Sequence, residues 1–137
     1  MFLEHKHLYM TKGMVPEEDY EIEFGKAEVM TEGDDVTIVA WSHMLLKAME
    51  AAETLAAENI RAEVINLRTL SPLDTDTIMT SVAKTNRVVI AQEAVRRGGV
   101  ASDIASYIQE EEFYSLDAPI EIVAGLNIPI PFNLTLE

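Results

Sequence analysis

The chain has 137 residues, of which 48% are hydrophobic and 25% charged, and its formal net charge is −14. This length suits one domain with its own core, and the acid excess argues against binding to nucleic acid phosphates, which needs clusters of Lys and Arg. The absence of cysteine excludes disulfides and thiolate sites, and no apolar run approaches the roughly 20 residues needed to cross a bilayer, so no membrane partner is expected.

Residues 1–26 have the pattern of an irregular lead-in. Between 17 and 24, acidic residues alternate with Tyr20, Ile22 and Phe24, which predicts an extended segment with one wet side and one packed side. The chain enters this segment at once, which suits a region within a longer protein. We therefore expect a lead-in over 1–26, coming from a missing N-terminal domain, and a folded domain over 27–137.

The first half of that domain begins with a short strand over Ala27–Met30 and a turn at 32–35. Val36–Ala40 is apolar and β-branched, as in a strand buried on both faces. Ser42 is expected to cap a helix that stops near Asn59. The packing stripe of this helix consists of Leu45, Ala48, Met49, Ala52, Leu55 and Ala56.

The second half repeats the alternation of strand and helix. Strands are expected over 62–66, 87–91 and 120–124. Between the first two, Pro72 ends regular pairing in a loop and Asp74 can cap a helix. The remaining features are a helix opened by Gly98-Gly99 and a tail, Ile128–Phe132, whose prolines exclude a regular helix.

Strands that alternate with helices predict an α/β fold with a mostly parallel sheet covered on both faces. The strand over 27–30 reaches the strand over 36–40 through only a short turn. We therefore expect these two to pair antiparallel, which would make the sheet mixed.

The only histidines are His5, His7 and His43. His5 and His7 lie two positions apart, on one face of an extended segment, where they could join Glu4 around a metal ion. No second histidine pair or cysteine pair completes a ligand set, so we expect no metal site. His43 is interpreted as a residue of the first helical turn.

Arg96-Arg97-Gly98-Gly99 places two cations and a glycine pair before a predicted helix, whose free N–H groups attract anions. The turn could bind a phosphate or a partner's carboxylate, although a tight packing turn is the favoured interpretation. Glu93 ends the preceding strand and could contact a neighbouring subunit or hold this turn. Because no serine has a nucleophile context and no dinucleotide or P-loop pattern occurs, we expect no catalytic or cofactor-binding residue.

Several segments occur in an order that resembles one family: FLEHKHLY, GKAEV, GDDVTIVAWS, EVINLRTLSPLDTDTI, RVVIAQEA, GGVASDIA and LDAPIEIVAG. Together they resemble the carboxy-terminal domain of the beta subunit of thiamine-diphosphate-dependent 2-oxo acid dehydrogenases, within the wider transketolase group. The resemblance implies a three-layer α/β/α domain with a five-stranded mixed sheet. It implies an assembly and docking role in a complex that oxidatively decarboxylates a 2-oxo acid and passes the acyl group to a lipoyl acyltransferase.

The resemblance also implies where the chemistry lies. Thiamine diphosphate and Mg²⁺ belong to the parent enzyme, between an alpha subunit and the amino-terminal domain of beta, so this chain alone is expected to be inactive. The implied partners are the alpha subunit, a second beta subunit and a basic domain of the acyltransferase. Pairing with a second beta subunit through this domain would make a homodimer. The acyltransferase domain is expected to contact Asp117, with Glu121 nearby. The implied location is cytoplasmic, or the mitochondrial matrix in a eukaryote.

The chain departs from the family in three places. Val95 stands where the family often has Pro, Arg97 stands where it often has Thr, and the family's final helix is lacking after the proline-rich segment. Two alternatives stay open: the corresponding domain of a transketolase or deoxyxylulose-phosphate synthase, and a free-standing acidic interaction module of flavodoxin-like shape.

Overall fold

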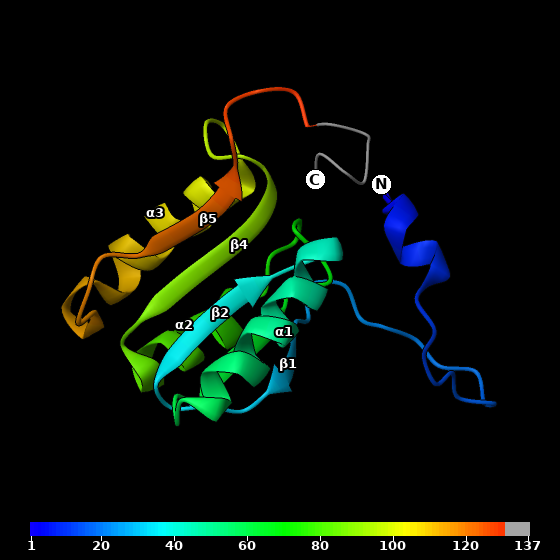
Figure 1. Ribbon diagram of the computed structural model, residues 1–137, viewed down its shortest axis with the longest axis horizontal. Coiled ribbons are helices and arrows are strands. Elements are labelled where there is room, and N and C mark those ends of the chain that lie inside the picture. Colours follow the sequence, from blue (N-terminus) through cyan, green and yellow to red (C-terminus); the bar gives the residue numbers. More distant parts are fainter. Residues whose placement is uncertain (131–137) are drawn as a thin grey trace.

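The computed structural model describes residues 1–130 and contains a five-stranded sheet with helices on both faces (Figure 1). The elements in chain order are η1 (Lys6–Met10), β1 (Glu28–Thr31), β2 (Val36–Ala40), α1 (His43–Ala57), β3 (Ala62–Asn66), α2 (Thr75–Thr85), β4 (Val88–Val95), α3 (Val100–Glu112), η2 (Phe113–Ser115) and β5 (Glu121–Gly125). The predicted alternation of strands and helices is confirmed.

The strand order is β1-β3-β2-β4-β5, and every neighbouring pair is parallel except β1 with β3. The mixed sheet is confirmed, but the expected pairing of β1 with β2 is wrong, because β3 lies between them. The connection from β1 to β2 crosses the start of β3, where a Cβ on Gly33 would overlap the backbone of Arg61 and Ala62. Asp35 holds this crossing by donating its N–H to the Arg61 carbonyl at 3.0 Å.

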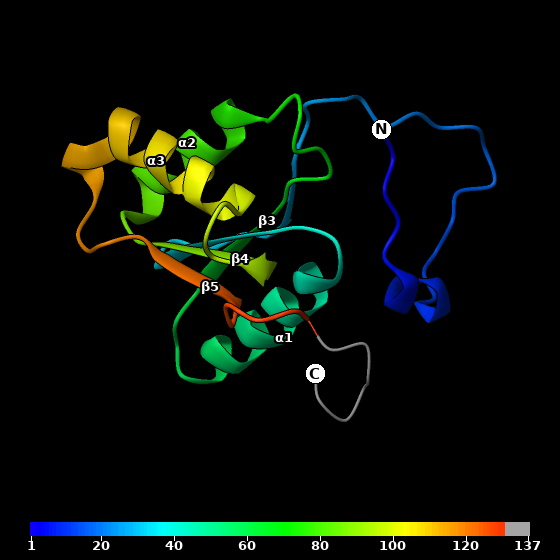
Figure 2. The same cartoon turned by 90° about the horizontal axis from the view of Figure 1, so that it is seen from above.

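The sheet separates two apolar cores, as the view in Figure 2 shows with α1 on one face and α2 and α3 on the other. Alternate residues of each strand enter opposite cores, so Val39 of β2 packs with α2 and α3 while Ile38 packs with α1. The three-layer α/β/α architecture is confirmed. No helix within residues 1–130 is both long and apolar enough to cross a membrane.

Within residues 1–130, every buried side-chain nitrogen and oxygen has a hydrogen-bond partner. The Thr37 hydroxyl lies 2.6 Å from that of Ser81 and 2.7 Å from that of Thr85. Buried Glu63 forms an ion pair with Lys84. Although burial by itself raises the pKa of Glu63, hydrogen bonds from Lys84 and Ser81 and the Lys84 charge outweigh it and hold the pKa below its usual value.

The two predicted helix caps have different outcomes. Asp74 caps α2 as expected, since its carboxylate accepts the Thr77 N–H at 3.2 Å. Ser42 precedes α1 but makes no capping hydrogen bond through its side chain, so that prediction is wrong. Its backbone is at φ 54°, ψ −136° instead of the extended conformation in which an N-cap side chain reaches the first turn.

The lead-in contains η1 and otherwise no regular element. The expected packed side is wrong for this chain, because Tyr20, Ile22 and Phe24 are 59%, 51% and 78% exposed. Residues 128–130 have no regular structure, in agreement with the expected irregular tail. Pro131 and Phe132, the rest of that tail, lie outside the described residues.

Asp74 ties the end of the lead-in to the domain. Besides capping α2, its buried carboxylate accepts the Ala27 N–H at 2.8 Å and the Thr77 hydroxyl at 2.8 Å. Burial alone raises its pKa, but these hydrogen bonds and the Lys26 charge outweigh burial, so the pKa lies below its usual value. The carboxylate therefore stabilises the fold while ionised.

We predict that Asp74→Ala lowers the free energy of unfolding by about 2–4 kcal/mol, because the cap is lost and the Ala27 N–H is left without its acceptor. Asp74→Asn should cost less, since one amide oxygen still accepts. Because folding depresses this pKa, its contribution is complete above pH ~4 and falls as the pH drops further. Urea unfolding across that range measures both effects, and Asp76→Ala in the same helical turn is the control.

Candidate functional site

The carboxyl ends of β2 and β4 bring His43 and Glu93 to one edge of the sheet. In the parallel register of these strands Ala40 lies opposite Ala91. His43 follows Ala40 by three positions at the start of α1, and Glu93 follows Ala91 by two positions within β4. This edge is the usual location of functional groups in open α/β sheets.

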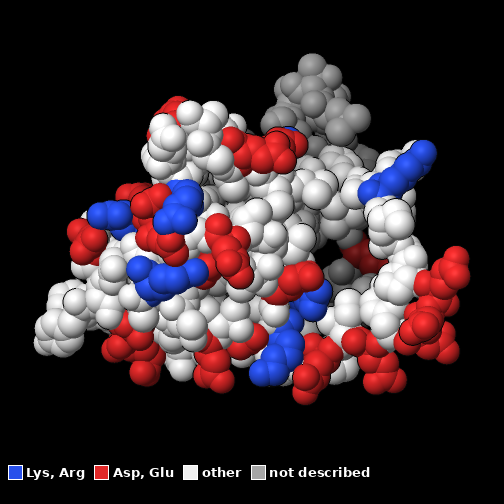
Figure 3. All heavy atoms as spheres, turned by 90° about the horizontal axis from the view of Figure 1, so that it is seen from below, with Lys and Arg blue, Asp and Glu red and all other residues white. Residues whose placement is uncertain are grey.

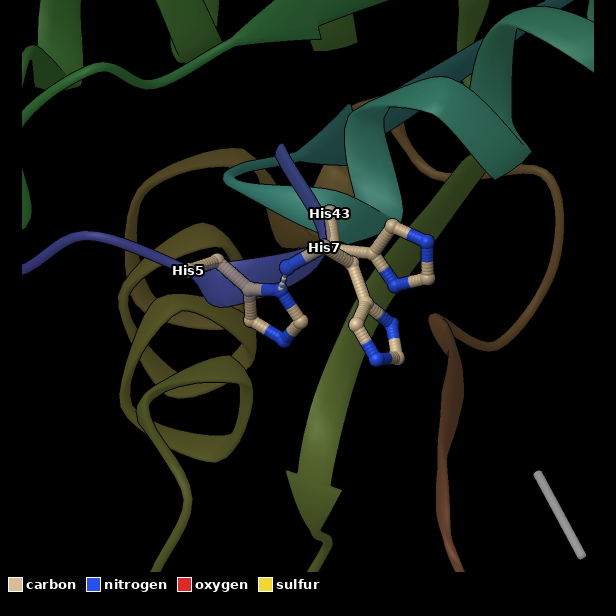
Figure 4. Close-up of side chains that lie close together, drawn as sticks. All are labelled: His5, His7 and His43. Atoms are coloured by element: carbon tan, nitrogen blue, oxygen red, sulfur yellow. Dashed lines mark hydrogen bonds between the residues drawn. The ribbon is translucent and has the colours of Figure 1, made fainter. Parts of the chain in front are cut away.

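The lead-in adds two more histidines to this edge, and Figure 4 shows the three imidazoles grouped together. The His5 and His43 rings stack at a centroid distance of 5.0 Å, and the His7 ring meets them edge-on at 5.2 and 5.4 Å. One ring nitrogen from each lies within 4.8 Å of the other two. Sequence reasoning paired His5 with His7 but treated His43 separately, which the structure corrects.

Glu93 contacts the lead-in and not the turn that follows β4. Its Oε2 lies 2.8 Å from His5 Nε2, with the two side chains 32% and 22% exposed. The other ring nitrogen of His5, Nδ1, accepts the His7 N–H at 3.3 Å. His5 therefore links the 3-10 helix η1 to β4.

The Arg96–Gly99 turn is organised from inside by Gln92, a buried residue of β4. Its amide donates to the carbonyl oxygens of Ala94 and Val95 at 3.1 and 2.9 Å, and its oxygen accepts the Ala101 N–H at 2.9 Å. One of the amino-terminal N–H groups of α3 is thus already bonded within the chain. This arrangement favours the packing-turn interpretation over an anion site.

A surface pocket of about 570 Å³ lies beside this turn. Arg96 and Arg97 line one side, and Ala124 and Gly125 at the end of β5 line another. The two guanidinium groups give the pocket a basic rim in an otherwise acidic protein, which suits contact with a carboxylate of a partner.

The two candidate partner-binding acids lie at the opposite edge of the sheet. Asp117 precedes β5 and its N–H donates to the Asn86 carbonyl at 2.9 Å, whereas Glu121 is the first residue of β5. The Asp117 carboxylate accepts from Arg87 at 3.0 Å, and both side chains are more than half exposed. The space-filling view in Figure 3 shows acidic groups outnumbering basic ones over one face of the molecule.

The described residues do not fit a thiamine diphosphate and Mg²⁺ site. Mg²⁺ takes oxygen ligands and bridges to phosphate oxygens, whereas the cluster of metal-binding type found within residues 1–130 consists of three imidazoles. The Ala101 N–H at the start of α3, which could otherwise face a phosphate, already donates to the Gln92 side-chain oxygen. We therefore assign no step of thiamine chemistry to this chain.

These features define an α/β/α domain whose two sheet edges carry different polar groups. The family described as "Transketolase, C-terminal domain" matches residues 25–137. The chain belongs to this family.

Curated relatives match over the whole chain. It is 50% identical to the pyruvate dehydrogenase E1 component subunit beta of Rickettsia felis and 47% identical to the acetoin:2,6-dichlorophenolindophenol oxidoreductase subunit beta of Cupriavidus necator, over 137 residues in each case. The pyruvate dehydrogenase beta subunit of Bacillus subtilis is 43% identical over 97% of the chain. The chain spans 40–42% of the length of these relatives.

Solved structures agree with this assignment. A split-gene transketolase, described as an inactive beta4 tetramer, superposes with a TM-score of 0.73 at 36% identity, over 85% of this chain and 37% of that one. A 2-oxoglutarate:ferredoxin oxidoreductase from Magnetococcus marinus has a TM-score of 0.51 at 18% identity, over 87% of this chain and 18% of that one. The latter likeness shows the fold alone.

We predict that Gly99→Ala destabilises the domain by about 2–3 kcal/mol, because overpacking a closed turn costs that much. A Cβ there would lie 2.7 Å from the Val95 carbonyl oxygen and would overlap the Gln92 amide. Gly98 is the matched control, since it has φ +68° but open space around it. Gly98→Asn should cost less than about 1 kcal/mol because Asn tolerates the left-handed region.

Thermal and urea unfolding of the two variants measure this difference. If Gly99→Ala and Gly98→Asn were equally stable, the conclusion that Gln92 packs tightly against this turn would be wrong.

Proposed function

We propose that this chain is the non-catalytic assembly and docking domain of a 2-oxo acid dehydrogenase beta subunit. The observation that carries the proposal is 43–50% identity, over 97–100% of the chain, to subunits named as beta subunits of pyruvate dehydrogenase and acetoin oxidoreductase. In this proposal the parent enzyme holds thiamine diphosphate and Mg²⁺ outside this chain. It decarboxylates a pyruvate-like 2-oxo acid and delivers the acyl group to a lipoyl acyltransferase.

The exposed apolar side chains of the lead-in support an assembly role. Besides Tyr20, Ile22 and Phe24, the lead-in exposes Phe2, Tyr9, Met10, Met14 and Val15. Monomeric proteins rarely expose so many large apolar groups on one segment, whereas subunit interfaces cover them. In the proposed parent, residues 1–26 lead in from an amino-terminal domain, and that domain or another subunit covers this segment.

Docking of the acyltransferase is assigned to Asp117 and Glu121. Both side chains are exposed at the amino edge of the sheet, and the net charge of −14 favours encounter with a basic domain. The Arg96–Gly99 turn lies at the other edge and is proposed as an interface with another subunit. A second beta subunit is a suitable partner, since the related split-gene transketolase is described as a beta4 tetramer.

The same structural relative supports a second candidate function. The corresponding domain of a transketolase would have the same fold and would assemble a different two-carbon transfer enzyme. The lower identity, 36% against 47–50%, favours the dehydrogenase subunit.

We predict that a complete beta chain containing this domain co-purifies with a matching alpha subunit and with the acyltransferase binding domain in a pull-down. The 137-residue chain alone should decarboxylate no 2-oxo acid. Failure of the complete chain to join either partner would overturn the proposed function, and formation of an active transketolase would select the second candidate.

We predict that Asp117→Asn in the complete beta subunit weakens binding of the acyltransferase domain several-fold, mainly by slowing association, because an exposed charge chiefly steers encounter. The domain should stay folded, since an exposed ion pair such as Arg87–Asp117 contributes about 0–1 kcal/mol. Surface plasmon resonance at two salt concentrations measures the association and dissociation rates. Glu53→Gln on the exposed side of α1 is the charge-matched control, and equal association rates for the two variants would refute the role of Asp117.

A further inference from the structure

We propose that His5, His7, His43 and Glu93 form a zinc site with four protein ligands at the carboxyl edge of the sheet. These residues come from three parts of the chain: the lead-in, the first turn of α1, and β4. All four side chains lie at the surface of the domain but are partly shielded, which gives an ion access together with a fixed surrounding.

The imidazoles are already arranged for a common ion. One nitrogen of each ring lies within 4.8 Å of the others. Zinc bonds to histidine nitrogen at about 2.0–2.1 Å, so tetrahedral ligands are about 3.4 Å apart. To bind one ion, the histidine nitrogens must therefore approach one another by about 1.4 Å at most. Rotations about the side-chain bonds can produce a movement of that size.

The hydrogen bonds of His5 identify the fourth ligand. Its Nδ1 accepts the His7 N–H, which leaves Nε2 as the nitrogen that binds the ion. Glu93 Oε2 lies 2.8 Å from that nitrogen but outside the 4.8 Å group of the three histidines, so the carboxylate reaches the ion by a side-chain rotation. Zinc then replaces the proton that His5 and Glu93 share, and one carboxylate oxygen completes an N₃O set.

The ligand types select the metal. Imidazole suits Zn²⁺, Cu²⁺ and Ni²⁺, whereas Mg²⁺ and Ca²⁺ prefer sets made only of oxygen. Four protein ligands leave no open position for a substrate, so the site is structural and not catalytic. Its effect is to clamp η1 onto α1 and β4, and a divalent cation is favoured further by the net charge of −14.

The competing explanation needs no metal: the rings stack, and His5 Nε2 contacts Glu93 Oε2 at 2.8 Å. The two explanations predict different numbers of zinc ions bound per chain and different effects of replacing each proposed ligand residue. Isothermal titration of the untagged, chelator-treated 137-residue chain with ZnCl₂ separates them. We expect one Zn²⁺ per chain and no heat from MgCl₂.

Variants locate the ion. His43→Ala and His7→Gln should each weaken zinc binding by roughly 100-fold or more, and Glu93→Gln by at least roughly 10-fold, because loss of a ligand costs no less than the 10–100-fold loss typical of groups that only orient ligands. Glu53→Gln, which removes a charge from the exposed face of α1, should leave the affinity unchanged. His7 lies in the lead-in, which contributes no side chain to either core before Ala27, so its variant tests the site even if His43→Ala does not fold.

Cobalt gives a second readout, because four-coordinate Co²⁺ absorbs visible light far more strongly than six-coordinate Co²⁺. Binding of one Co²⁺ with the intense four-coordinate spectrum, lost in His7→Gln, would support the site. Zinc binding well below one ion per chain, wild-type affinity in His7→Gln, or a six-coordinate cobalt spectrum would each overturn it.

Discussion

The parallel pairing of β2 with β4 is the constraint on which the rest of the structure depends. It aligns Ala40 with Ala91, so the two strands run toward the same edge of the sheet. Because side chains alternate along each strand, the same register sends Val39 and Ile90 into one core and Ala40 and Ala91 into the other. Displacing either strand by one residue would turn its side chains into the opposite core and change the separation of His43 from Glu93.

Much of the fold could be predicted from local patterns. The β-branched run over Val36–Ala40 identified a buried strand, and Asp74 identified a helix start, because both signals reside in contiguous residues. The partner of β1 could not be predicted, since it depends on β3 occupying the place beside β2. The side-chain cap expected of Ser42 failed because its backbone adopts a left-handed φ, for which the residue type gave no signal.

The candidate site was harder to predict than the fold. His5 and His43 are far apart in the sequence, and they meet only because the lead-in folds back to the edge where α1 begins. No pattern of hydrophobic residues predicts that the lead-in folds back onto the domain. The lead-in contributes no core residue from which its position could have been predicted. A histidine three positions after a buried strand was one available signal, because strand ends converge at a common edge. The acids at the opposite edge remain predictions, and their separation from the histidines lets both edges be occupied at once.

The lead-in also differs from the rest of the chain in what it contributes to folding. Both cores are built from residue 27 onward, with Ala27 at the margin of one of them. The α/β unit can therefore form both cores without a side chain from residues 1–26. In the proposed assembly a partner covers the lead-in, and until then its exposed apolar side chains are accessible to proteases and chaperones. Rapid assembly of the proposed kind would therefore limit the exposure of this segment to proteolysis.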